Sequence, residues 1–233
     1  MYDSNQPYAS QRSPVAAENL VATSQPLAVE AGIQALRKGG NAIDAALSAA
    51  ITLTVVEPNN NGLGSDAFCI LWDGSALIGI NGSGRSPRRW TRSHFEGRQA
   101  MPALGWDCVT VPGAVSIWVA LSKRFGKLPF ADLFESAIHY AREGFLVGPK
   151  SAYYWKLLKN HYKDFEAFKE HFHPIPEAGE RFVRKDMAKT LELIAESEGE
   201  TFYRGEIADR IIAACKDGGG LMEKADPVSY THL

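Results

Sequence analysis

The sequence has few cysteines and little net charge. Its 233 residues include only three cysteines, Cys69, Cys108 and Cys215, which are far apart and form no CxxC pair. This excludes a disulfide framework of the kind that stabilises small secreted domains, and we expect reduced thiols in a cytoplasmic protein. The formal net charge of −2 provides no general attraction to nucleic acid or to an anionic membrane, and we expect neither as a partner.

Long apolar runs are also missing. The longest strongly apolar run, residues 45–56, is interrupted by polar side chains and is shorter than the roughly 20 residues that a membrane-spanning helix needs. The first residues are polar, without the basic and then apolar regions of a secretory signal. We expect an extended arm over residues 1–15.

Apolar periodicity and capping signals predict a largely helical chain. Pro26 suits the first position of a helix, and a Gly-Gly pair ends that helix. Asn41 begins a second helix at once, with Asp44 three residues later in a capping-box arrangement. This helix, Ala42–Val56, is apolar nearly all round, as buried helices are. Further helices are predicted over residues 112–125, 130–143, 149–171, 186–196 and 203–216.

Two β-favouring runs, AFCILW and SALIGI, are joined by Asp73-Gly74, which predicts a β-hairpin. The stretch GLGSDA, residues 62–67, precedes them and matches G-x-G-x-x-A, a form of the dinucleotide-binding fingerprint. That fingerprint needs a strand before the glycines and a helix after them, because the phosphate lies on the amide groups of a helix N-terminus. Here a helix enters the loop and a strand leaves it, so the element order argues against a nucleotide site.

Four segments in order resemble the gamma-glutamyltransferase (gamma-glutamyltranspeptidase) family of N-terminal nucleophile hydrolases. They are the first helix pair with its GGNA-x-DAA junction, the loop NNNGLGSDAF, the stretch from VTVPGAV to AREGF, and the stretch from GERFV to FYRGEIADRI. We therefore expect a gamma-glutamyltransferase-like large-subunit region over residues 16–222. It would follow the arm at residues 1–15 and precede a truncated or atypical end at residues 223–233.

The resemblance implies an α+β fold, the four-layer αββα sandwich of N-terminal nucleophile hydrolases, with only the helix-rich large-subunit part in this chain. Family precursors cut themselves in two, and the new N-terminal threonine of the small subunit attacks an amide to form an acyl-enzyme. By the same resemblance, that threonine lies beyond Leu233. Thr231 and His232 resemble the Thr-His start of a small subunit. We reject them as the nucleophile site, because an N-terminal nucleophile must begin a strand in a large sheet. We expect no catalytic residue and no activity in this chain alone, no cofactor, and a partner in the small-subunit continuation.

The resemblance also indicates which residues surround the substrate. The glycine loop corresponds to the family's N-x-x-G-x-G-G-x-x-F loop at the edge of the pocket, although Ser65-Asp66 stands where relatives show Gly-Gly. We therefore expect pocket-loop residues at Asn61, Gly62, Gly64 and Asp66.

A departure from the family occurs at NGSGRSP, where transpeptidases show F-R-E-x-A-P. Counting back four from Pro87 puts Ser83 at the position of the arginine that grips the α-carboxylate of the γ-glutamyl group, and Gly84 at the acidic position. Arg85 follows, and its guanidinium is suited to bind a carboxylate through two bonds; the alternative is an exposed surface residue. We take Arg85 and Ser83 as candidate substrate-binding residues.

This departure leaves several functions open. By the resemblance, we expect the substrate to be a γ-glutamyl compound or a similar small acidic amide. One alternative is a relative that hydrolyses other small amides, because family relatives without the arginine motif include oxamate and cephalosporin side-chain amidases. The alternative of a different class is a catalytically inert fragment or interaction domain that keeps the fold without the active site.

Other residues of chemical interest have simpler explanations. Glu57 and Asp66 flank the glycine loop and could be general bases, although hydrogen bonding to loop amides is the simpler role. The basic run GRSPRRWTRSHFEGRQ fits a solvated helix face better than a nucleic-acid contact in a chain of net negative charge. We expect no metal site, because residues two apart diverge on a helix. The metal-ligand types considered are His161, Asp164, His171 and His173.

Overall fold

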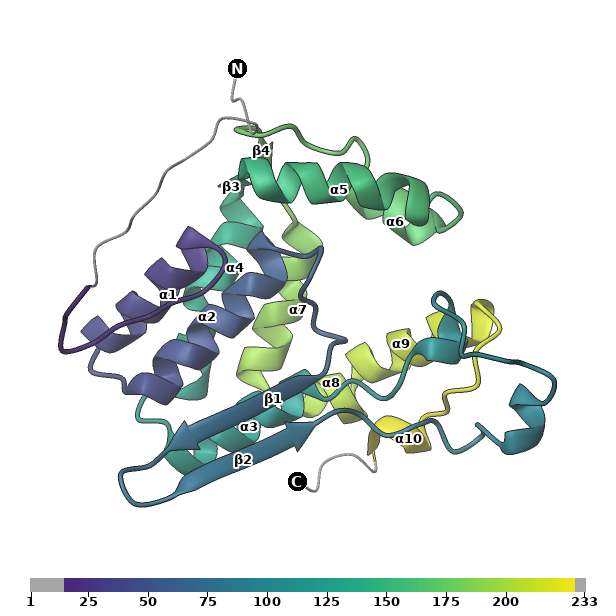
Figure 1. Ribbon diagram of the computed structural model, residues 1–233, viewed down its shortest axis with the longest axis horizontal. Coiled ribbons are helices and arrows are strands. Elements are labelled where there is room, and N and C mark those ends of the chain that lie inside the picture. The colour runs from purple at the N-terminus through teal and green to yellow at the C-terminus, as the bar shows by residue number, and fades with distance from the viewer. Residues whose placement is uncertain (1–14, 229–233) are drawn as a thin grey trace. The chain divides into compact units, whose positions relative to one another are not determined.

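The computed structural model describes residues 15–228. Nearly all of the predicted arm, together with Thr231 and His232, lies outside the described residues. The chain divides into two compact units, one formed by Met1–Asn61 with Leu133–Lys189, the other by Gly62–Asp132 with Thr190–Leu233. Figure 1 labels the helices and strands of both units.

Three helices form the framework of the first unit. They are α1 (Pro26–Arg37), α2 (Ala42–Val56) and α4 (Glu135–Glu143), and α2 packs against both of the others. The predicted capping box is present at the start of α2: Asn41 Oδ1 accepts hydrogen bonds from the backbone of the first turn, and Asp44 Oδ2 accepts one from the Asn41 N–H at 2.8 Å. Buried residues lie on nearly all sides of α2, as its composition predicted.

The single helix predicted over residues 149–171 is wrong, because the structure has two helices there, α5 (Pro149–His161) and α6 (Glu166–Phe172). Tyr162 ends α5, and its ring lies 5.4 Å from that of Phe168 in α6. The two rings lie close together across residues 163–165, where the helix is interrupted. The helical pattern of the sequence continues through this break, so periodicity did not locate it.

The first unit also contains a short antiparallel pair that the sequence did not predict. Its strands are β3 (Phe145–Leu146) and β4 (Arg181–Phe182). The next helix, α7 (Lys185–Glu196), agrees with the predicted helix over residues 186–196. Within residues 15–228, no helix combines the length and apolar character needed to cross a membrane.

The predicted hairpin is confirmed in the second unit. Strands β1 (Ala67–Trp72) and β2 (Leu77–Gly82) pair antiparallel along their whole length. The turn forms because Asp73 Oδ1 accepts hydrogen bonds from the backbone of the two residues that follow the glycine, and because Gly74 adopts a φ of +102°. One face of the hairpin packs on α3 (Ala114–Phe125), and Figure 1 shows the hairpin lying along that helix.

The remaining helices of the second unit are shorter than predicted. Residues 203–216 form the end of one helix and most of another, α8 (Glu200–Arg204) and α9 (Glu206–Asp217), with an extended Gly205 between them. Only glycine fits at position 205 without a shift of its neighbours, because a β-carbon there would lie 2.8 Å from the Cα of Thr201. The shorter elements are η1 (Arg92–Phe95), η2 (Trp106–Cys108), η3 (Phe130–Phe134), which replaces the first turn of the helix predicted over 130–143, and α10 (Ala225–Val228).

Candidate substrate site at the open end of the hairpin

The register of the hairpin brings two of the predicted site segments together. Ala67 pairs with Gly82 at the end of the hairpin opposite the turn. The glycine loop, residues 62–66, leads into Ala67, and Ser83 follows Gly82, so both segments adjoin this open end. Residues 111–114 form a third segment, hydrogen-bonded to both of the others.

Ser65 organises the glycine loop. Its N–H donates to the Gly62 carbonyl at 3.1 Å, and its hydroxyl accepts a hydrogen bond from the Gly62 N–H at 3.0 Å. Its carbonyl oxygen accepts from the N–H groups of Gly113, at 3.2 Å, and Ala114, at 2.9 Å, which are the first donors of α3. A phosphate at this helix end would need those two donors. They already bind the loop, in agreement with the rejection of a nucleotide site.

The carboxylates beside the loop have different surroundings. Glu57 accepts hydrogen bonds from the side chains of Ser24, at 2.5 Å, and Asn60, at 2.7 Å. Asn61, also in the first unit, donates its amide to the Glu57 carbonyl at 3.3 Å. Asp66 is exposed and has no hydrogen bond or ion pair with any residue from 15 to 228, so the bonds to loop amides that we expected for it are not formed. The Glu57 carboxylate thus has hydrogen-bond partners close to it in the structure, whereas the Asp66 carboxylate has none among the described residues.

The backbone at Ser83 and Arg85 has a form that requires glycine between them. Gly84 has a φ of +23°, and a β-carbon there would lie only 1.9 Å from the Val111 carbonyl oxygen. The Ser83 N–H donates to Asn81 Oδ1 at 2.9 Å, and the Arg85 carbonyl accepts from the Val111 N–H at 2.9 Å. The acidic residue that the family resemblance implies at this position does not fit without a shift of the backbone.

The side chains of Ser83 and Arg85 are exposed at this end of the hairpin. Neither forms a hydrogen bond or an ion pair with the part of the chain that the structure describes. The guanidinium of Arg85 and the carboxylate of Asp66 are therefore a cation and an anion at one end of one hairpin, and neither has a partner among residues 15–228. Such a pair of groups can receive a substrate that carries both charges.

The basic run is a loop with one short helical turn, so the helix face predicted there is wrong. Its histidine and one of its arginines instead converge on one carboxylate: Asp107 lies 2.8 Å from His94 Nε2 and 2.8 Å from Arg98 Nη1. The hydrogen bond from His94, followed by that from Arg98, holds the pKa of Asp107 below its usual range. Sequence reasoning missed this cluster because His94 and Asp107 are thirteen positions apart, a spacing with no helical or strand period.

The candidate metal ligands are not brought together. His171 Nδ1 lies 3.6 Å from an oxygen of Asp186, which also binds the Arg184 guanidinium at 2.7 Å. The hydrogen bond from Arg184 is the main cause that lowers the pKa of Asp186 to about 2. Between residues 15 and 228 no group of three or more His, Cys, Asp or Glu residues is placed to hold a metal ion.

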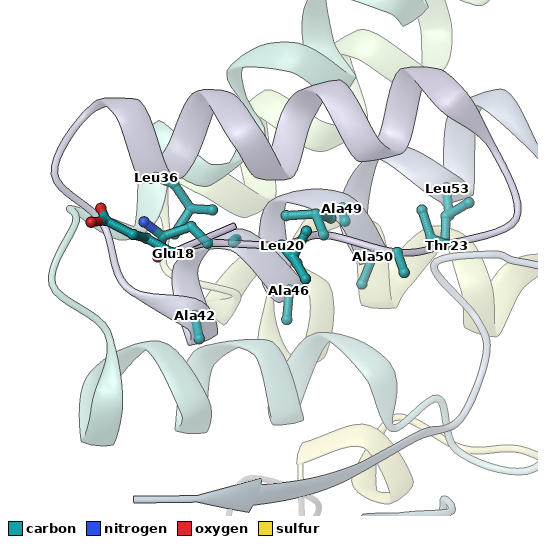
Figure 2. A pocket seen from close by; sticks show the side chains of 13 residues that line it. Glu18, Leu20, Thr23, Leu36, Ala42, Ala46, Ala49, Ala50 and Leu53 are labelled. Carbon is teal, nitrogen blue, oxygen red and sulfur yellow. The ribbon is translucent and has the colours of Figure 1, made fainter. Parts of the chain in front are cut away.

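A hollow of about 420 Å³ lies in the first unit, between the extended residues 18–23 and helices α1 and α2. Figure 2 shows Leu20 lying across alanines of α2, among them Ala46 and Ala49. Of the residues that line the hollow, Glu18 alone is ionisable. A lining of this kind offers no pair of groups for acid–base or nucleophilic chemistry.

Solved structures define the class of this fold. The chain is similar to a cephalosporin acylase from Bacillus halodurans, with a TM-score of 0.92 and 44% identity, covering 97% of this chain and 45% of that one. It is also similar to a gamma-glutamyltranspeptidase from Pseudomonas nitroreducens, complexed with L-DON, with a TM-score of 0.86 and 30% identity, covering 92% and 65%. The fold is the helix-rich, incomplete α+β part of an N-terminal nucleophile hydrolase, as the sequence predicted.

The gamma-glutamyltranspeptidase family model matches residues 28–232. The chain is 37% identical to the glutathione hydrolase-like YwrD proenzyme of Bacillus subtilis, over 91% of this chain and 41% of that protein. It is 32% identical to a glutathione hydrolase proenzyme of Pseudomonas sp., over 96% and 41%. The chain therefore belongs to the gamma-glutamyltranspeptidase family, and it spans about two fifths of the length of these curated relatives.

Proposed function

We propose that this chain is the large-subunit portion of an amidohydrolase or transferase that acts on γ-glutamyl or similar small acidic amides. The observation that carries the proposal is the meeting of three segments at the open end of the hairpin in a member of this family. There the unengaged Arg85 guanidinium receives the α-carboxylate of the substrate. Asp66 is suited to its α-ammonium group, and Ser83 offers a hydroxyl beside them.

The reaction itself needs the continuation of the chain. The hydroxyl of an N-terminal threonine beyond Leu233 attacks the amide carbonyl, and its own α-amine takes the proton. The carbon–nitrogen bond breaks, the amine leaves with a proton, and the acyl group stays on the threonine as an ester. Water or a second amine then resolves this ester. The residues of this chain bind and orient the acyl group, and they need no cofactor for these steps.

The outward face of the hairpin supports a partner in the same precursor. Four large apolar side chains are largely exposed there: Phe68 (68%), Ile70 (77%), Trp72 (64%) and Leu77 (71%). A contiguous apolar surface of this kind marks an interface. We propose that the small-subunit continuation covers it; the cytoplasmic location expected from the sequence stays a prediction.

A second candidate is a simple amidase without a preference for γ-glutamyl groups. The observation that favours it is Gly84, where the Val111 carbonyl leaves no room for the acidic residue of transpeptidases. The 44% identity to a cephalosporin acylase points in the same direction. This candidate shares the threonine chemistry and differs in what the hairpin end binds.

The presence of the nucleophile is tested by activity with and without the continuation. We expect no hydrolysis of γ-glutamyl-p-nitroanilide by the 233 residues alone, and hydrolysis by the same chain together with its continuation. Activity of the 233 residues alone would overturn the location of the nucleophile. A completed but inactive enzyme would support the inert-fragment alternative, and turnover of only a cephalosporin side-chain amide would support the simple amidase.

The role of Arg85 is tested by Arg85→Ala in the complete enzyme. We expect kcat/KM for an acidic amide to fall about 10- to 100-fold, because a charge-assisted bidentate pair contributes roughly 1.5–3 kcal/mol. Arg88→Ala is the matched control, since Arg88 is also exposed and its backbone N–H, which binds Asp226 at 3.0 Å, is kept. Equal kinetics of the two variants would remove Arg85 from the site.

A further inference from the structure

We propose that Tyr203 is a positioning residue for the candidate substrate site, acting through its hydroxyl group. The side chain is only 3% exposed. Its hydroxyl donates a hydrogen bond to the Pro112 carbonyl at 2.9 Å and accepts one from the Ser116 N–H at 3.0 Å. One buried oxygen atom thus joins α8 to the segment that precedes α3 and to the first turn of that helix.

The hydroxyl serves as a cap that the sequence of α3 does not supply. The residue at the N-cap is Gly113, which has no side chain to accept a hydrogen bond from the first turn. The Ser116 hydroxyl does not serve either, because it donates to the Gly113 carbonyl at 2.7 Å. Three donors at this helix end, the N–H groups of Gly113, Ala114 and Ser116, are instead satisfied from outside the helix, by the Ser65 carbonyl and by Tyr203.

Residues 111–114 transmit this restraint to both walls of the site. The Val111 N–H binds the Arg85 carbonyl, and the N–H groups at the start of α3 bind the Ser65 carbonyl of the glycine loop. Pro112 lies between these two connections, and Tyr203 holds its carbonyl. A displacement of Pro112 therefore moves the Arg85 backbone and the glycine loop together.

Loss of the hydroxyl would free this segment while the aromatic ring still filled its place. Tyr203→Phe leaves the buried Pro112 carbonyl and the partly buried Ser116 N–H without their partner, and buried polar groups without a partner are strongly disfavoured. The segment gains by moving to reach other partners. The anchoring itself needs no assumption about the reaction; its effect on substrate binding rests on the proposed function.

The test is Tyr203→Phe in the complete enzyme, with Phe202→Leu as the matched control. Phe202 is equally buried and its ring lies 5.1 Å from that of Tyr203, but it has no hydroxyl group. Amide hydrogen exchange is followed in peptides that cover residues 62–66 and 111–116, and KM and kcat are measured with γ-glutamyl-p-nitroanilide.

For Tyr203→Phe we expect exchange in both peptides to rise by about 10-fold and KM by roughly 5- to 10-fold, with kcat within about 3-fold, as for loss of substrate positioning. Phe202→Leu should not raise amide exchange in these two peptides above its effect on the rest of the protein. Equal exchange in the two variants overturns the anchoring, and faster exchange with an unchanged KM overturns the positioning role. A wild-type enzyme that does not hydrolyse the anilide contradicts the proposed function alone, because the exchange data still decide whether Tyr203 anchors these segments.

Discussion

Gly84 has a φ of +23° and the Val111 carbonyl oxygen stands where its β-carbon would be. Two independent constraints therefore act on one residue, backbone conformation and space. The nearest obstacle is a backbone atom, and the hydrogen bond between the Val111 N–H and the Arg85 carbonyl holds the two segments close together. At this scale, the residues that position 84 can accept are decided by how near one backbone comes to another.

Gly84→Ala should lower the free energy of unfolding by at least about 2 kcal/mol, because a non-glycine residue in a disfavoured backbone region costs roughly 1–3 kcal/mol before the clash is counted. Urea unfolding of the complete enzyme measures this loss. The control is Gly79→Ala in β2, where no atom lies within 4 Å of an added β-carbon, and where we expect a change within about 0.5 kcal/mol. Similar stabilities of the two variants would contradict the steric account.

At the scale of elements, the sequence predicted best where the signal is local. The capping box of α2 and the Asp73-Gly74 turn depend on neighbours within a few residues, and both form as predicted. The cap of α3, by contrast, depends on Tyr203, 87 residues from Ser116. Propensity and periodicity contain no information about such a distant partner, which is why this cap was missed.

Asn41→Ala should destabilise the protein by about 1 kcal/mol, the usual cost of losing a helix N-cap. Asn41 Oδ1 accepts hydrogen bonds from the N–H groups of Ile43, at 2.9 Å, and Asp44, at 3.1 Å, and alanine leaves both without this partner. Thermal unfolding checks the loss. Asn41→Ser, which keeps a capping oxygen, should retain most of the stability; a loss equal to that of alanine would argue against capping as the cause.

For the whole molecule, family resemblance predicted the fold class and the family, and the comparisons confirm both. The residues of the site are a different matter. Gly62, Gly64, Asp66, Ser83 and Arg85 came from motif positions, and their roles remain proposals. The structure adds that these segments adjoin one end of a hairpin, a relation that depends on strand register and could not be read from motif spacing.

The 233-residue chain alone should be poorly soluble and self-associate through the outward face of the hairpin. Ile70→Thr with Leu77→Thr should reduce this association, because it removes apolar surface and keeps residues that favour strands. Size-exclusion chromatography with light scattering checks it. Leu71→Thr, on the buried face, should not help and should lower the melting temperature. A monodisperse wild-type monomer with a cooperative melt would contradict the prediction.

The close approach of the Val111 carbonyl to Gly84 also limits how the sequence of this segment can change in evolution or by engineering. An acidic residue at position 84 is blocked until the neighbouring backbone has moved, and a moved backbone has no benefit until the acidic residue is present. Exchange between a Ser-Gly-Arg segment and an Arg-Glu segment therefore requires several coupled changes. A designer who wishes to convert one specificity into the other should transplant residues 81–87 and 110–114 as one block.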